Sequence, residues 1–349
     1  MSSSPTPAGI PPPSAPQVAV VSAAGNLSAA VYREAKALNP NIFPHSLPAR
    51  VLIKPNLCDL VAWENGVTTD PAWLAILASE LRSIRPDVQI AVIESDAIGA
   101  YKTYRSCDET YERLGYTDAA RNAGVKLINL SRAPSFDIRV PELPFAVTIP
   151  EIFLQEFFFV SVANLKVHPY ERMTGILKNS LGLLPAADIS HYHPYLATVI
   201  SALHRLCPPD LCIIDGRIGL EGKGPIQGDP VRTNTIIFSN DALAADLTAC
   251  RLMTIAPQTV PHLRQTLKHL ARGYHEFAIA GELRPRKFTF DQQQLHPEIL
   301  AKFHNRRLHR ELEIFTNRWI SRFFRFKQQP IAFLSGAIPK LTRRVYGSR

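Results

Sequence analysis

Short continuous apolar runs alternate with stretches of helical spacing along residues 17–253. The apolar runs are typical of buried strands, and apolar residues that recur every three or four positions are typical of amphipathic helices. The pattern predicts strands at Val18–Ala23, Arg50–Asn56, Val88–Ser95, Val125–Ser131, Phe157–His168, Leu211–Gly216 and Thr233–Asn240, and helices at Leu27–Leu38, Pro71–Ile84, Asp108–Ala123, Thr198–Leu206 and Ala242–Met253. The proline-rich residues 132–150 indicate a β-rich excursion. Alternating strands and helices predict an α/β fold, with a mostly parallel sheet and flanking helices.

The two ends of the chain differ in composition from this core. Residues 1–16 contain six prolines and no charged side chain. They are expected to form a disordered leader, because so little apolar surface cannot offset the entropy of ordering. A secretory signal is not expected, since the segment lacks a basic start and its prolines interrupt any apolar stretch. Residues 17–256 are expected to form the α/β core, and residues 257–349 a basic helical region.

Positive charge is concentrated at the C-terminal end. The chain carries 39 Lys and Arg and 30 Asp and Glu residues, a net charge of +9. Residues 301–349 hold 12 basic and 2 acidic residues, a charge of +10, which leaves −1 for residues 1–300. A nucleic-acid-binding core should carry a basic face of its own. No nucleic-acid partner is therefore expected.

Residues 312–326 have the pattern of an amphipathic helix. Its apolar face would consist of Leu312, Phe315, Trp319, Ile320, Phe323 and Phe326, with arginines beside it. Residues 312–349 are expected to pack on the domain or on a partner protein, with contact to an anionic membrane surface as the alternative. Five scattered cysteines and no apolar stretch of transmembrane length favour a cytoplasmic protein, with peripheral attachment at the inner membrane face as an alternative.

Polar residues follow four of the predicted strands. The strand ends supply Lys54 and Asn56, Glu94 and Asp96, Asn164 with Lys166 and His168, and Asp215. Because ligands of open α/β sheets bind beyond the carboxyl ends of the strands, these residues are expected to share one site. Taken singly, each could simply end its strand. The carboxylates Glu94, Asp96 and Asp215 would bind a divalent metal or orient the lysines.

The segment "KVHPYERMTGILKNSLG" adds Thr174, Lys178 and Asn179. If it is helical, Thr174 and Lys178 share a face, because they are four residues apart. No acidic partner is near in the sequence, so a carboxylate or phosphate ligand would satisfy them; a solvated surface lysine is the alternative. His191 and His193 would share one face of a strand, which suits a metal or general acid–base chemistry and also arises by chance.

Five glycines follow the strand that ends at Asp215. They are Gly216, Gly219, Gly222, Gly224 and Gly228. Their backbone amides could form an anion nest, and the alternative is a turn without a ligand. The segment is not a P-loop, because Gly224 follows Lys223 where Ser or Thr is required.

The motifs "IKPNL", "NGVTTDP", "VIESDA", "NLKVHPYERMTGILKNSLG", "IIDGRIGLEGKGPIQGDP" and "SNDALAADLTA" resemble the domain-of-unknown-function family 362 (DUF362), roughly from Val18 to Met253. The resemblance implies a mixed α/β domain in a cytoplasmic bacterial or archaeal protein, and little about the reaction. Many relatives carry ferredoxin-type cysteine runs, which are absent here, so no iron–sulfur cluster is expected. A more remote likeness is to nickel-pincer lactate racemases, which use histidines as acid and base and a lysine-tethered nickel cofactor. His168, His191 and Lys178 would be analogues in kind, although no motif aligns them.

These observations favour an enzyme that acts on a small anionic metabolite. The expected ligand-binding residues are Lys54, Asn56, Thr174, Lys178, Asn179, Gly222, Gly224 and Gly228, and the expected catalytic residues are His168, His191 and Lys166. A racemase-like isomerisation and a metal-assisted proton transfer are the reaction types considered, and the cofactor is left open. The alternative is a non-catalytic ligand-binding or scaffold protein attached to a membrane or a partner through its tail.

Overall fold

The computed structural model describes residues 16–25, 27–98, 104–185, 190–270, 273 and 277–291. Its strands are β1 (Gln17–Ser22), β2 (Arg50–Lys54), β3 (Gln89–Glu94), β4 (Ala97–Ile98), β5 (Tyr104–Arg105), β6 (Lys126–Asn129), β7 (Ser135–Arg139), β8 (Ala146–Pro150), β9 (Phe158–His168), β10 (Arg172–Thr174), β11 (Leu211–Glu221), β12 (Asp229–Ser239) and β13 (Ala278–Gly281). Its α-helices are α1 (Ala29–Leu38), α2 (Trp73–Ile84), α3 (Cys107–Arg113), α4 (Tyr116–Ala123), α5 (Ile176–Asn179), α6 (Leu196–Leu206), α7 (Ala242–Met253) and α8 (Pro261–His269). The leader up to residue 15 and the tail, residues 312–349, lie outside the described residues.

One mixed sheet organises these elements. Its strand order is β13–β1–β12–β11–β9–β2–β3–β6, and β10 pairs with β9. The pairs β13–β1, β11–β9, β9–β2, β2–β3 and β3–β6 are parallel. The pairs that β12 makes with β1 and β11, and that β10 makes with β9, are antiparallel. The predicted α/β fold with a mostly parallel sheet is therefore confirmed.

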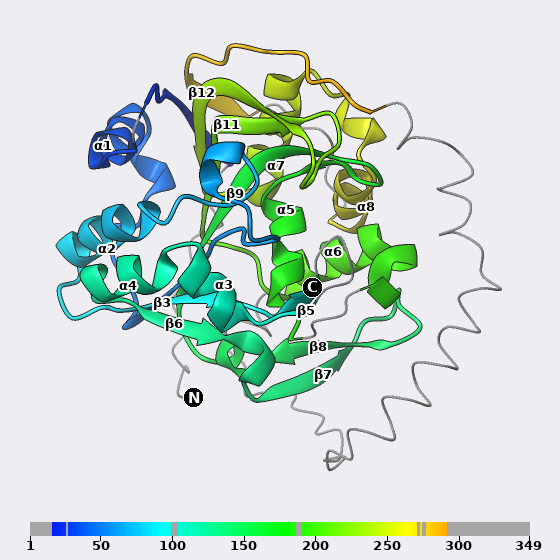
Figure 1. Cartoon of the computed structure of the whole chain (residues 1–349), viewed down its shortest axis with the longest axis horizontal. Helices are drawn as coiled ribbons and strands as arrows, with labels where there is room; N and C mark the ends of the chain where they lie inside the picture. Colours follow the sequence, from blue (N-terminus) through cyan, green and yellow to red (C-terminus); the bar gives the residue numbers. More distant parts are fainter. Residues whose placement is uncertain are drawn as a thin grey trace, which may run out of the picture.

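Helices cover both faces of the sheet (Figure 1). Helices α1 to α4 pack on one face, and α5 to α8 pack on the other together with the β7–β8 hairpin. Alternate residues of β9 supply the two cores, Val160 and Val162 to the first and Ala163, Leu165 and Val167 to the second. A central strand that is buried on both faces needs apolar residues at nearly every position, which explains its long apolar run.

Two elements differ from the sequence prediction. The helix expected over Asp108–Ala123 is two helices, because Gly115 adopts a left-handed conformation (φ 77°) between them. Strand β11 continues past Gly216 to Glu221 and forms a long hairpin with β12. Strand β13 and helix α8 lie in the expected C-terminal region, residues 257–349, where β13 pairs with β1 and the apolar side of α8 is buried against the core.

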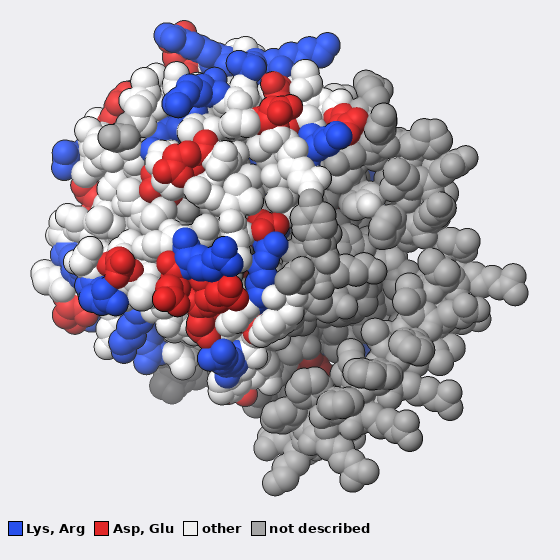
Figure 2. All heavy atoms as spheres, in the orientation of Figure 1, with Lys and Arg blue, Asp and Glu red and all other residues white. Residues whose placement is uncertain are grey.

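In the view of Figure 2, the described residues carry both positive and negative side chains on the surface. Lys and Arg side chains lie among Asp and Glu side chains over most of that face. Several exposed charges of the described residues form local pairs, such as Arg113 with Glu109 and Arg132 with Asp108. The exposed pairs contribute little to stability, about 0–1 kcal/mol each, because both charges remain solvated.

Candidate functional site

Several of the predicted polar residues lie near the point in the sheet where the order in which the chain visits the strands changes direction. From β2 the chain proceeds to β3 and β6 on one side, and from β9 to β11 on the other. The carboxyl ends of β2 and β9 therefore flank a topological switch point, the place where open α/β sheets bind ligands. Strand β9 is longer than β2, because its pairing with β2 ends at Ser161 while the strand runs on to His168. Its last residues extend the sheet toward this edge.

Lys54 and Glu94 form a buried ion pair at the ends of β2 and β3. Lys54 Nζ lies 2.5 Å from Glu94 Oε2 and donates a hydrogen bond to the carbonyl of Pro55 at 2.9 Å. Both residues are almost completely buried, at 1% and 6% exposure. Burial raises the pKa of Glu94 above its usual value, and the attraction of Lys54 opposes this rise. The charge of Lys54 is thus balanced by Glu94 within the fold.

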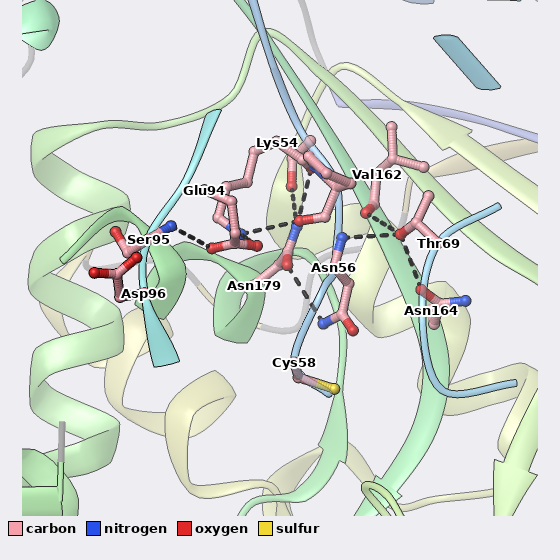
Figure 3. A network of polar contacts seen from close by, with 12 residues as sticks. Lys54, Asn56, Cys58, Thr69, Glu94, Ser95, Asp96, Val162, Asn164 and Asn179 are labelled. Carbon is pink, nitrogen blue, oxygen red and sulfur yellow. Dashed lines mark hydrogen bonds and ion pairs between the residues drawn. The ribbon is translucent and has the colours of Figure 1, made fainter. Parts of the chain in front are cut away.

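Three asparagines continue this network across the switch point (Figure 3). Asn179 donates to the carbonyl of Lys54 at 3.2 Å and to Ser161 Oγ at 3.1 Å, and Asn56 Nδ2 lies 3.4 Å from Asn179 Oδ1. The hydroxyl of Thr69 bridges the strands by accepting from the Asn56 amide and contacting Asn164 Oδ1 at 3.0 Å. These contacts hold the chain after β2 against β9. The asparagines also contact the two lysines of this edge, since Asn179 donates to the carbonyl of Lys54 and Asn56 accepts from Lys166.

Lys166 is a buried cation with neutral partners. Its Nζ donates to the carbonyl of Val67 at 2.8 Å, to Asn56 Oδ1 at 2.9 Å and to Cys58 Sγ at 3.2 Å. These contacts use all three ammonium donors. The residue is 1% exposed, and no carboxylate of the described residues pairs with it. Its positive charge therefore remains uncompensated by any described side chain.

Lys178 lies beside Lys166 and has no hydrogen-bonding or ion-pair partner among the residues that the structure describes. Strand β10 pairs Thr174 with Lys166, and α5 starts two residues later, which brings Lys178 back toward β9. Among the described residues, no hydrogen bond or ion pair holds its ammonium, although Glu171 and Cys58 act on it electrostatically. Burial and then the charge of Lys166 lower the pKa of Lys178 to about 8. A fraction of this lysine is therefore neutral near physiological pH.

His168 has a defined tautomer. Its Nδ1 accepts hydrogen bonds from the backbone amides of Tyr170 at 3.3 Å and Glu171 at 3.1 Å. The ring must then carry its proton on Nε2. Burial, and then the positive charge of Lys178, hold the pKa of His168 well below its usual value. At neutral pH His168 is therefore a neutral hydrogen-bond donor through its Nε2–H.

A buried triad supports both residues from behind. His262 Nδ1 lies 2.8 Å from Glu171 Oε2, and its Nε2 lies 4.0 Å from Asp246 Oδ2. Asp246 accepts from the amides of Ile176 at 2.7 Å and Leu177 at 3.1 Å, so it holds the start of α5. Burial raises the pKa of Asp246 to about 6. His262 thereby connects the Glu171 segment, which holds His168, to the helix that carries Lys178.

The three carboxylates proposed for a metal do not come together. Asp96 accepts from the amide of Cys107 at 2.7 Å and from Asn129 Nδ2 at 2.8 Å, so it organises a turn. Asp215 pairs with Arg217 at 2.8 Å and accepts from Trp73 Nε1 at 2.9 Å, and Glu94 is bound to Lys54. Over the described ranges, no three His, Cys, Asp or Glu side chains are grouped closely enough to hold a metal ion.

Two further expectations change with the structure. Thr174 lies in β10 and donates to the carbonyl of Asn164 at 3.1 Å, so it does not share a helix face with Lys178. Residues 190–195 form a short 3-10 helix, and not the strand on which His191 and His193 would share a face. The side chain of His191 lies outside the described residues.

Residues 51–251, more than half of the chain, match the family model described as a domain of unknown function (DUF362). The chain belongs to this family. The thylakoid-associated protein sll1697 of Synechocystis sp. is 28% identical over 109 residues, which cover 29% of this chain and 34% of that protein. The lactate racemase apoprotein of Thermoanaerobacterium thermosaccharolyticum is 12% identical, with a TM-score of 0.42 over 63% of this chain and 51% of its own. The chain thus spans about a third of the first and half of the second.

Several of the five glycines that follow Asp215 in this DUF362 protein lie where the chain packs closely against itself. Gly216 and Gly219 lie inside β11, and the other three lie at the tip of the β11–β12 hairpin. A Cβ atom on Gly224 would stand 2.3 Å from the carbonyl oxygen of Val167, and one on Gly228 would stand 2.1 Å from that of Glu221. The hairpin therefore approaches the end of β9 so closely that side chains are excluded.

Gly224→Ala is expected to lower the free energy of unfolding by about 1–3 kcal/mol, because overpacking displaces the backbone of Val167. Denaturant unfolding would measure this loss. The matched control is Lys223→Ala, whose side chain is 59% exposed and lies 3.9 Å from Asp291; its effect should stay within about 0.5 kcal/mol. Equal, small effects of the two substitutions would contradict the packing explanation.

Sequence reasoning overlooked Glu171 and His262. Glu171 stands inside the quoted motif, and His262 lies in a stretch that was read as a polar tail. One signal was present, because His262 and Thr266 occupy the same side of α8 as Leu263 and Leu267. Polar residues at core positions of a helix indicate buried partners elsewhere.

Proposed function

We propose that this DUF362 protein is an enzyme that acts on a small anionic metabolite at the Lys166–Lys178 site. The observation that carries the proposal is the pair of neighbouring lysines without a described carboxylate partner. Buried charges in proteins are normally paired, so the buried Lys166 beside the half-buried Lys178 favours an anion as the missing partner. The ligand's carboxylate or phosphate would lie beside both lysines, attracted by the fixed charge of Lys166 and by the ammonium form of Lys178.

The chemistry best supported at this site is proton transfer. The neutral fraction of Lys178 can accept a proton, because its pKa of about 8 lies close to the working pH. His168 offers an Nε2–H that can stabilise negative charge developing on a substrate oxygen. Asn56 and Cys58 hold Lys166 in place by accepting its hydrogen bonds. This division of roles differs from the sequence prediction, in which a histidine moved the proton.

Sulfate tests the anion site without an assigned substrate. The full-length protein is expected to bind sulfate and to melt at a higher temperature in its presence, since a ligand of the native state stabilises it. Binding should weaken as the pH rises through about 8, because the Lys178 ammonium then loses its proton. Sulfate itself does not titrate in this range, so the loss would report on the protein.

The matched variants separate the site from general charge effects. Lys178→Met should abolish the sulfate-dependent rise in melting temperature, whereas Lys126→Met, which removes an exposed lysine of β6, should leave it unchanged. Equal sulfate responses in the wild type and Lys178→Met would refute the proposed site.

A second candidate function is attachment to a membrane surface. It is favoured by the amphipathic pattern of residues 312–326 and by the name of the thylakoid-associated relative. Among the described helices, none is long and apolar enough to cross a membrane. An anionic surface would attract the +10 charge of residues 301–349.

Deletion of residues 312–349 is expected to reduce co-sedimentation with vesicles that contain anionic lipid. Neutral vesicles should bind neither form strongly, because the arginines then lose their electrostatic attraction. Unchanged binding of the shortened protein to anionic vesicles would argue against attachment through the tail.

A further inference from the structure

We infer that Lys178 acts as a nucleophile that forms an imine with the carbonyl carbon of a small 2-oxo acid. The inference rests on the proposed anion site and names its substrate class. It follows from three features of the described residues: an amino group without a partner, a fixed positive charge beside it, and a neutral N–H donor nearby.

The first feature is the freedom of the Lys178 amino group. A lysine that is locked in an ion pair stays protonated and cannot attack a carbonyl. Lys54 is such a lysine, since Glu94 lies 2.5 Å from its Nζ. Lys166 is also occupied, with all its donors bound to neutral acceptors. Of these three lysines, Lys178 alone keeps a nitrogen lone pair that can become available.

The second feature is the charge of Lys166. Burial together with a neighbouring cation is a recognised way to activate a lysine as a nucleophile. The same charge attracts the carboxylate of an oxo acid, which sits next to the carbonyl carbon. The carboxylate of the oxo acid would thus balance the charge of Lys166, while the adjacent carbonyl carbon would lie against the Lys178 amino group. A phosphate or sulfate ion would satisfy the charge and offer no carbon to attack.

The third feature is the orientation of His168. Its Nδ1 is held by the amides of Tyr170 and Glu171, so its Nε2–H is free to hydrogen-bond to a carbonyl oxygen. Such a donor polarises the carbonyl and stabilises the oxygen as it gains negative charge. Its ring stays neutral throughout, because it stabilises the oxygen without surrendering its proton.

The reaction balances without an oxidant or reductant. The Nζ lone pair forms a C–N bond while the carbonyl π pair moves to oxygen. The C–O bond then breaks, and that oxygen leaves with the two protons of the neutral amine as one water molecule. The product is an imine between Lys178 and the oxo acid.

Reductive trapping tests the inference. The full-length protein is incubated with pyruvate and sodium borohydride, which delivers hydride to an imine carbon. Intact mass and peptide mapping are expected to show one reduced pyruvate on the peptide that contains Lys178. Lys178→Arg, which keeps a positive charge, should fall to the level of a borohydride-only blank, and Lys126→Arg should label like the wild type.

Two measurements on the wild type keep the test independent of variant folding. Trapping should increase as the pH rises through about 8, because the free amine attacks, whereas sulfate binding should decrease over the same range. Excess sulfate should suppress trapping. Sulfate binding without a pyruvate adduct at Lys178 would overturn the imine and leave the anion site standing. If the wild type neither bound sulfate nor formed a pyruvate adduct, the proposed function would be overturned as well.

Discussion

Glu94→Ala is expected to lower the free energy of unfolding by about 3–5 kcal/mol, because it leaves the Lys54 ammonium buried without a counter-ion. Lys54 is 1% exposed, and its other described hydrogen bond goes to the carbonyl of Pro55. A neutral carbonyl compensates a charge far less than a carboxylate does. Denaturant unfolding of the purified variant would measure the loss.

The double variant Lys54→Met/Glu94→Leu serves as the control for Glu94→Ala. Replacing both members of a buried ion pair by apolar residues of similar size is often nearly neutral, since no charge is left to desolvate. The double variant should therefore be more stable than Glu94→Ala. A loss below about 1 kcal/mol in Glu94→Ala would contradict the role of the pair. The prediction also separates this role from metal binding, which would cost affinity for a metal and little stability.

His262→Leu is expected to have the second large effect, a loss of about 3 kcal/mol of stability together with weaker sulfate binding. The imidazole is fully buried and lies 2.8 Å from Glu171 Oε2. Leucine is of similar size and leaves the buried Glu171 carboxylate without this donor, which is costly because the charge stays desolvated. Sulfate binding should weaken because Glu171 holds His168, and Asp246 holds the start of α5.

Two variants distinguish this positioning role from simple loss of packing. His262→Asn keeps a donor near the place of Nδ1 and should recover part of both the stability and the sulfate affinity. His45→Leu removes an exposed histidine and should change the stability by no more than about 0.5 kcal/mol. If His262→Leu lost stability while its sulfate affinity stayed at the wild-type level, the triad would be structural and unrelated to the site.

The fold was largely predictable because the strands of a covered sheet need continuous apolar runs. The run at the end of β9 and the polar residues that follow β2 and β3 placed Lys54, Glu94 and Lys166 correctly at one edge. The break in the helix before α4 was missed, since Gly115 can occupy a helix as well as a left-handed turn. Helix α8 and β13 were assigned to the tail because their composition is polar.

The roles of the site residues were harder to predict, because they depend on partners that are far away in the sequence. Lys54 and Lys178 look alike in the sequence, yet Glu94 neutralises the first, and no carboxylate of the described residues pairs with the second. Asp215 looked like a metal ligand, and it is bound instead to Arg217 two residues later. A side chain's charge state is set by its neighbours in space, and a single sequence does not contain that information.

The sequence by itself determined the α/β class, the edge of the sheet where polar groups meet and the membership of DUF362. Each of these follows from local patterns of apolar and polar residues, or from motifs in fixed order. Only the tertiary structure decided which lysine has no partner within the described part of the chain, which nitrogen of His168 carries the proton, and which buried groups stand behind both. The physical reason is that burial and hydrogen bonding select one protonation state among several that the same residue could adopt in water.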